Sequence, residues 1–419
     1  MRASVRPLVT ICAVVMFLLL PVQFVYLPLR MSAADVWAVA TMPLLWVALA
    51  RLRQTVRLPY LAALLFVLAA TLLASLLSAD PVGGLAVALK ETYLYAWMVT
   101  MAAVFALGGP RTPRRLLQAW YAGVAVNGAL ILAQFVHPPL QQQMNAAVGA
   151  LGGTLDPYRP SGLMANTNAA AVFQLMGFVP LVALRLPPRT LVPLGLFTLA
   201  SIVATGSMGA MLAWAAGLAC ALALLAVYAR DLSSASSLVL RSTLVAAVVA
   251  AAVLVFTSDV SEIEARLQSV FLDRGERSAH TRFGIWDRGV RILQEEVPVG
   301  GIGPGRFREL EGDEMHNDLL SFAVERGVLG LLGLCVIGAL VVGRAMRTFR
   351  ADPSPDGRWR VVFPAAVVAL LAESQTHEVF HVREAWLVLA LQEAVLLGAL
   401  GPAAPAAPPG PPQPSSTAR

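Results

Sequence analysis

Apolar residues occur along this chain in long uninterrupted runs, separated by short polar segments. Most of the runs approach the about 20 residues that a helix needs to cross a bilayer. They cover residues 8–27, 34–50, 59–77, 88–108, 116–136, 162–184, 190–204, 207–228, 239–257, 317–343, 361–377 and 384–401. The pattern predicts an all-α integral membrane protein with about twelve transmembrane helices. The first run is longer than the core of a secretory signal peptide, so we expect it to remain as the first span.

Arginines decide the predicted orientation. With the N-terminus in the cytoplasm, the connections on the inner side hold Arg51, Arg53, Arg57, Arg111, Arg114, Arg115, Arg185, Arg189, Arg230, Arg241, Arg344, Arg347, Arg350, Arg358 and Arg360. The only acids there are Asp231, Asp352 and Asp356. Cytoplasmic loops are enriched in Lys and Arg. Both termini are therefore predicted to lie in the cytoplasm.

Composition excludes several classes of protein. Of the 419 residues, 58% are hydrophobic and only 13% are charged, whereas soluble domains carry about 25% charged residues. This excludes a cytosolic enzyme, a nucleic-acid-binding protein and a disordered chain. The three cysteines all fall inside apolar runs, so we expect neither disulfides nor a cysteine metal site. Residues 1–401 are predicted to form one membrane domain, and the proline-rich tail 402–419 is predicted to be disordered.

One connection, residues 258–316, is much longer than the others and is predicted to lie outside. It contains 12 of the 25 acids of the chain together with eight arginines. A loop of this length is usually functional. Within it, the apolar spacing over Thr281–Glu296 predicts an amphipathic helix that ends before Pro298. Such a helix would lie on the bilayer or over the bundle, with arginines at the level of the headgroups.

Two further segments of this loop carry candidate chemistry. Residues 300–307 (GGIGPGRF) follow no parallel strand and open no helix of a βαβ unit, so they do not form a dinucleotide-binding motif. They are expected to form a tight turn where the backbone approaches a ligand. His316 stands where the chain re-enters the membrane. A histidine there can accept the proton of a hydroxyl near neutral pH, or it can simply cap and pack against the next helix.

The order of these segments is more specific than any one of them. Residues 282–286 (RFGIW), 298–307 (PVGGIGPGRF), 316–320 (HNDLL) and 325–332 (ERGVLGLL) follow one another. Together they resemble the signature region of the O-antigen ligase and polymerase superfamily. Upstream, residues 159–169 (RPSGLMANTNA) resemble a second motif of that family.

The resemblance implies a metal-independent transferase that needs no cofactor. Such enzymes move a glycan from undecaprenyl pyrophosphate to an acceptor hydroxyl on the periplasmic face. The acceptor is lipid A–core in ligases and another lipid-linked glycan in polymerases. His316 matches the catalytic histidine of the family and Arg282 matches its loop arginine, which would hold the pyrophosphate. Further candidates for substrate binding are Arg288, Arg159, Arg306 and Asn317.

One position departs from the family pattern. The family usually has an arginine in a Ser/Thr-Arg-Gly stretch at the head of a middle span, where this chain has Met208 between Ser207 and Gly209. If that arginine binds pyrophosphate in relatives, either another residue such as Arg159 replaces it here, or the activity differs from that of a typical ligase.

A rival hypothesis comes from His377-Glu378-Val379-Phe380-His381, which matches the H-E-x-x-H pattern. On a continuous helix the two histidines would bind zinc and Glu378 would act as the general base of a membrane protease. Glu373 or Glu384 would then complete the metal site. Because the segment falls at an outer turn where the helix should break, we favour an interfacial turn or the wall of the outer cavity. A flippase or transporter would need paired halves and charges in mid-membrane, and the ionisable residues instead cluster at the ends of the runs.

Overall fold

The computed structural model describes residues 2–23, 32–51, 58–109, 111–150, 155–156, 159–228, 274–295, 300–350 and 357–397. Within these ranges every regular element is a helix and no strand occurs, as predicted for an all-α protein. The predicted span 239–257, the start of the outer loop at 258–273 and the tail 402–419 lie outside the described residues.

The described helices overlap every predicted apolar run except 239–257. They are α1 (Arg2–Leu19), α2 (Ala33–Ala50), α3 (Leu61–Leu77), α4 (Pro81–Leu107), α5 (Thr112–Val136), α6 (Pro138–Ala150), α7 (Thr167–Met176), α8 (Phe178–Ala183), α9 (Pro188–Thr205), α10 (Met208–Tyr228), α13 (Arg274–Glu295), α14 (Arg306–Glu311), α15 (Asp318–Arg350), α16 (Trp359–Glu373) and α17 (Arg383–Leu396). A short 3-10 turn, η3 (Val379–His381), precedes α17.

Four of these helices are long and apolar enough to cross a membrane by themselves. They are α2, α5, the first 18 residues of α10, and α15. The other apolar helices are shorter, including Leu61–Leu77 and Arg189–Thr205. The chain is therefore an integral membrane protein, while the full number of twelve spans stays a prediction.

Two details differ from the predicted runs. The run 162–184 is split into α7 and α8 at Gly177, because Pro180 has no N–H to continue the helical bonds. The amphipathic helix α6 was not predicted at all. Its Gln141 side chain donates to the carbonyls of Asp156 (2.8 Å) and Arg159 (3.0 Å), so this helix supports the loop that carries Arg159.

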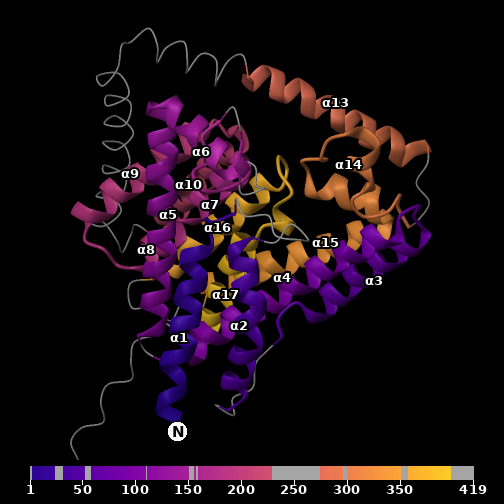
Figure 1. Cartoon of the computed structure of the whole chain (residues 1–419). Helices are drawn as coiled ribbons and strands as arrows, with labels where there is room; N and C mark the ends of the chain where they lie inside the picture. The colour runs from indigo at the N-terminus through magenta and orange to yellow at the C-terminus, as the bar shows by residue number, and fades with distance from the viewer. Residues whose placement is uncertain are drawn as a thin grey trace, which may run out of the picture.

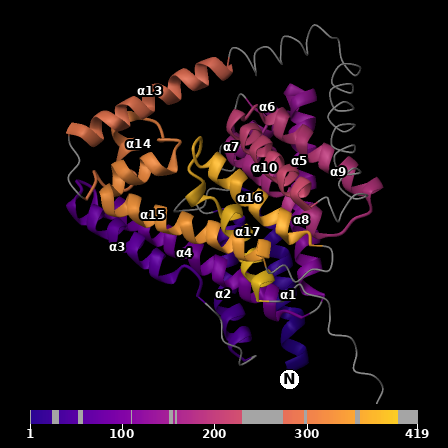
Figure 2. The same cartoon turned by 180° about the vertical axis from the view of Figure 1, so that it is seen from behind.

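The helices form a main bundle with an arm beside it (Figure 1). The arm consists of α3, α4 and α15, which pack along one another. In the bundle, α10 packs against α16, and α17 packs against α4 of the arm. Helix α13 lies above the arm, and α14 lies between α13 and the arm (Figure 2). This arrangement places α13 and α14, the described helices of the long connection, over the arm.

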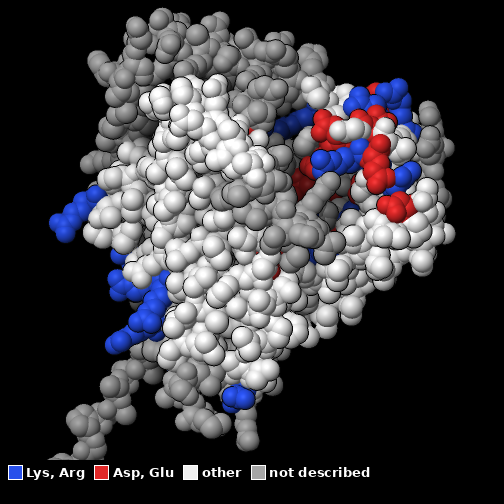
Figure 3. Space-filling model, viewed as in Figure 1, with Lys and Arg blue, Asp and Glu red and all other residues white. Residues whose placement is uncertain are grey.

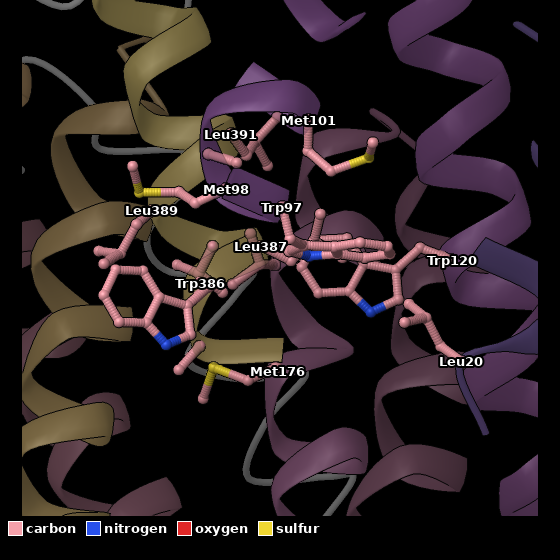
Figure 4. Packing of buried hydrophobic residues seen from close by; sticks show 14 of the residues in the cluster. Leu20, Trp97, Met98, Met101, Trp120, Met176, Trp386, Leu387, Leu389 and Leu391 are labelled. Atoms are coloured by element: carbon pink, nitrogen blue, oxygen red, sulfur yellow. The ribbon is translucent and has the colours of Figure 1, made fainter. Parts of the chain in front are cut away.

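The core is apolar and rich in aromatic residues where α4, α5 and α17 meet. Trp97 and Trp120 are fully buried and lie next to one another, with Trp386 and Leu387 nearby (Figure 4). Aromatic side chains of this size bury about 150–250 Å² each. Rigid packing at this depth fixes the helix ends that carry the site described next.

Candidate active site

Helix α15 is broken in its third turn, at Gly327, and the glycine-rich turn packs against the break. Gly327 has φ 65° and ψ −163°, which no helix contains. The carbonyls of Val324 and Glu325, which precede the break, accept hydrogen bonds from the backbone N–H groups of Ile302 and Gly303, both at 3.0 Å. Backbone polar groups at membrane depth must find such partners.

This contact corrects the expected role of the GGIGPGRF turn. The backbone of Gly301, at φ 77°, approaches the α15 backbone and not a ligand, since a Cβ there would lie 2.5 Å from the Glu325 carbonyl oxygen. The turn thus donates hydrogen bonds to the carbonyls at the helix break, and it holds the start of α14 against α15. Ile285, Phe307, Met315 and Val324 form a small core that joins α13, α14 and α15.

His316 lies at the start of α15 in a strained backbone conformation. Its φ is 53°, a left-handed value that non-glycine residues rarely adopt. Its Nε2 is 3.4 Å from a carboxylate oxygen of Asp313, and its buried Nδ1 has no hydrogen-bond partner among the described residues. The indole N–H of Trp286 on α13 donates to the carbonyl of Met315 (3.0 Å), which fixes the chain just before His316.

The turn between α16 and α17 is tied to the same end of α15. The Asp318 carboxylate accepts from the backbone N–H groups of Val379 (3.0 Å) and Phe380 (3.2 Å). Asn317 caps α15 by accepting from the N–H of Leu320 (2.9 Å), and its amide donates to the carbonyl of Gln375 (3.3 Å). Asn317 therefore positions this turn in the structure.

This tie brings a second histidine to His316. The imidazole rings of His316 and His377 are nearly parallel, with centroids 6.0 Å apart. Burial lowers the pKa of His377 to about 4, and the neighbouring charges of His316 and Arg282 act in the same direction. His377 is therefore neutral at physiological pH, and its Nδ1 also has no partner within the described part of the chain.

Two of the predicted arginines reach this cluster. Burial lowers the pKa of Arg282, the cation of Arg159 adds to that effect, and the carboxylate of Glu373 opposes it. An arginine remains protonated in any case. The charge of Arg159 also acts on His377. The charges of Arg282 and Arg159 therefore act on His377, whose ring is stacked on that of His316.

Arg159 is held by its own loop and by α5. Its Nε is 3.2 Å from Asp156, and its guanidinium also donates to the side-chain oxygen of Asn168 (3.4 Å). The loop is fixed further by α5, where the Gln134 side-chain oxygen accepts from the N–H groups of Ser161 (3.0 Å) and Gly162 (2.9 Å). Polar residues such as Gln134 within a predicted span are the signal that sequence reasoning could have used.

The other two predicted arginines form ion pairs with acidic residues at the protein surface. The Nε of Arg288 lies 2.7 Å from Glu311, and Arg306 pairs with Glu309 on the same short helix. On the face seen in Figure 3, charged side chains gather around a hollow between the bundle and the α13–α14 segment, while the flanks are largely uncharged. Arg288 and Arg306 remain predicted substrate-binding residues.

The H-E-x-x-H segment is not a zinc site in this structure. Helix α16 ends at Glu373, so His377 and His381 do not share a helical face. His377 faces His316, whereas Nε2 of His381 is 3.4 Å from the buried carboxylate of Glu91. Among the described residues no group of three or more His, Cys, Asp or Glu side chains is arranged to hold a metal.

His381 belongs to a buried charge network that the sequence analysis missed. Glu91 on α4 pairs with the fully buried Arg326 on α15 (2.7 Å), and Arg326 also donates to Thr71 on α3 (3.2 Å). The guanidinium lies 4.1 Å from the centre of the Phe322 ring. The available signal was that Glu91 and Arg326 both occur within apolar segments.

The residue after Met208 lies close to α16. A Cβ at Gly209 would lie 3.3 Å from Oε2 of Glu373. That Oε2 atom is buried and has no hydrogen-bond partner in the described ranges. Gly209, at the head of α10, is therefore a neighbour of Glu373.

These features define a helical membrane protein with a site of histidines and arginines at one end of its bundle. Residues 193–335 match the family model described as O-antigen ligase. The predicted resemblance is confirmed over this segment, which contains Arg282 and His316, and members of that family are glycosyltransferase-like enzymes. No curated protein matches the chain.

Proposed function

We propose that this protein is a lipid-linked glycan transferase of the O-antigen ligase type. It moves a glycan from undecaprenyl pyrophosphate to an acceptor hydroxyl, on lipid A–core or a similar lipid, at the periplasmic face of the inner membrane. The observation that carries the proposal is the stacking of strained His316 on His377, on which the charges of Arg159 and Arg282 act. The family match over residues 193–335 supports it.

The chemistry follows from the side chains. The acceptor oxygen attacks the anomeric carbon of the donor, the bond from that carbon to the pyrophosphate oxygen breaks, and its electron pair leaves with the pyrophosphate. Nδ1 of His316 takes the hydroxyl proton, because Asp313 at Nε2 favours the tautomer whose lone pair is on Nδ1. Arg282 and Arg159 stabilise the charge that develops on the leaving group.

A deletion strain tests this proposal. Loss of the protein should leave glycan polymer on its lipid carrier, and the wild-type gene should restore its transfer on a surface-glycan gel. If the deletion strain instead attaches single repeat units to the core, the protein is a polymerase of the same superfamily. An unchanged glycan pattern would contradict both functions.

Point variants in the same strain test the site. His316→Ala removes the proton acceptor and Arg282→Ala removes a pyrophosphate ligand, so each should lower transfer by about a hundredfold or more. Membrane abundance, measured by immunoblot, should equal that of the wild type. Normal transfer by either variant would remove that residue from the mechanism.

A further inference from the structure

Glu378 is a carboxylate in the turn that carries His377, and the mechanism above gives it no role. It follows His377 in the chain, and its charge acts on His377 with the opposite sign to those of Arg282 and Arg159. Its side chain is 21% exposed, whereas those of Glu91 and Arg326 behind it have no exposure. Glu378 is thus the accessible end of a charge network that runs into the core.

The network fixes Glu378 from behind. Nδ1 of His381 is 3.6 Å from Oε2 of Glu378, and Nε2 of the same ring is 3.4 Å from Oε1 of Glu91. The imidazole therefore bridges two carboxylates, and Glu91 in turn is held by Arg326 at 2.7 Å. A side chain anchored through three consecutive contacts has little rotational freedom left to lose when a ligand binds.

The same contacts keep Glu378 ionised. Burial by itself would raise the pKa of Glu378, but the bond with His381 and the charges around it outweigh burial and hold the pKa well below its usual range. For His381, burial acts to lower the pKa, and its two carboxylate neighbours raise it above the usual value. An imidazolium between two carboxylates is the charge state that these shifts favour.

A fixed carboxylate selects its ligand by charge. It repels phosphate groups, so it does not suit the pyrophosphate side of the reaction. It accepts hydrogen bonds from hydroxyls, and its two oxygens can serve two hydroxyls on neighbouring carbons. The acceptor sugar presents such hydroxyls next to the attacking one.

We propose that Glu378 binds the acceptor glycan by accepting hydrogen bonds from the hydroxyls beside the attacking oxygen, and that His381 positions it by bridging it to Glu91. This inference rests on the proposed function and adds the chemistry of the acceptor. The acceptor sugar is polyhydroxylated and carries no phosphate on the carbons next to the attacking hydroxyl. The H-E-x-x-H segment thereby acquires a role without a metal.

Transfer kinetics test the assignment. The full-length protein is placed in lipid nanodiscs with lipid-linked glycan and total glycolipid, both extracted from the deletion strain and separated from each other. Glu378→Gln keeps the shape but loses the charge, so the apparent KM for the glycolipid should rise by about tenfold to a hundredfold, the loss expected for a hydrogen bond to a charged group. The KM for the lipid-linked donor should stay within about twofold.

A double-mutant cycle separates positioning from binding. His381→Gln should raise the same KM, and the double variant should be no worse than Glu378→Gln alone, because His381 acts through Glu378. Asp287→Asn, on the exposed surface of α13 where Asp287 pairs with Arg291, is the matched control and should leave both KM values unchanged. Size-exclusion profiles and melting temperatures check folding, and Glu378→Asp replaces Glu378→Gln if the latter is not monodisperse.

The outcomes are distinct. Unchanged glycolipid KM in Glu378→Gln, or a rise in donor KM instead, overturns this inference while wild-type transfer upholds the proposed function. Additive effects in the cycle overturn the role given to His381. A wild-type protein that transfers nothing between the two fractions overturns the proposed function and the inference with it.

Discussion

His316 combines a strained backbone conformation with a ring nitrogen that has no hydrogen-bond partner among the described residues. A non-glycine residue in the left-handed region costs about 1–3 kcal/mol, and the described residues contain only two others, Tyr60 and Arg185. The ring gains no hydrogen bond at Nδ1 in return. Strain held by the surrounding structure, together with a polar atom left free, is typical of a residue kept for its chemistry.

The departure at Met208 leads to a rescue prediction. If Arg159 replaces the usual family arginine, Arg159→Ala should lower transfer by about tenfold or more. Met208→Arg places a guanidinium at the head of α10, next to Gly209, which lies near Glu373. In the Arg159→Ala background it should recover a substantial part of the lost transfer, measured on the surface-glycan gel.

The control for this rescue is Met208→Lys, which supplies a charge without the bidentate fork. Recovery by both substitutions would indicate that charge alone is needed. No recovery by Met208→Arg, with normal membrane abundance, would contradict the exchange between these two positions.

His377 should make stability depend on pH. Its pKa is about 4 in the folded protein, against 6.5 for an unperturbed histidine. A lowered pKa means that its stabilising contribution is complete above about pH 6.5 and is lost as the pH falls toward 4. Relative to His377→Gln, the wild type should therefore lose about 2 kcal/mol between pH 7.5 and pH 5.

Thermal unfolding of both proteins in detergent at the two pH values measures this difference. Carboxylates that titrate in the same range affect both proteins alike, so the comparison isolates residue 377. Equal pH dependence of the wild type and the variant would show that His377 is not held neutral by its surroundings.

At the scale of the element, the broken helix α15 organises the site. Its break at Gly327 exposes carbonyls that accept hydrogen bonds from the glycine-rich turn. Its first residue is Asp318, and His316 lies two residues before it. This one helix end contacts the glycine-rich turn, α13 and the α16–α17 connection. A substitution that disturbs the turn should therefore lower the free energy of unfolding.

Gly301→Ala tests that contact. The new methyl group would meet the Glu325 carbonyl at 2.5 Å in a left-handed backbone, so the melting temperature should fall clearly, with about 2 kcal/mol or more lost. Gly305→Ala is the matched control: φ is 80°, nearly the same, but no atom lies within 4 Å of its Cβ position. It should cost only about 1 kcal/mol. Equal effects would show that the backbone contact at Gly301 contributes nothing beyond φ.

The elements also show which features a sequence can predict. Long apolar runs identified the helices, and the motif around His316 and Arg282 identified the site, because both signals are local. The meeting of His377 with His316 was beyond reach, since it depends on Asp318 holding a turn some 60 residues away. The role of Gly301 was misread for the same reason: the sequence shows a flexible turn but not what the turn touches.

At the scale of the whole molecule, the fold brings motifs from three distant regions to one end of the bundle. Arg159 comes from the loop before α7, Arg282 from α13, and the histidines from the segments just before α15 and α17. The uncharged flanks in Figure 3 fit lipid contact, and the charged hollow lies toward one end. The proposed reaction therefore depends on which side of the membrane that end faces.

Cysteine labelling decides the side. In a background with Cys12, Cys220 and Cys335 replaced by alanine, Glu309→Cys on α14 should react with a membrane-impermeant maleimide once the outer membrane is permeabilised. Arg114→Cys, at the start of α5, should react only after the inner membrane is opened, because the arginine pattern assigns that end to the cytoplasm. Both side chains are exposed at the protein surface. A lack of labelling therefore reports the side of the membrane on which the residue lies and not burial. The reverse pattern would put His316 on the cytoplasmic side, where it cannot reach a glycan displayed on the outer leaflet, and would contradict the proposed transferase.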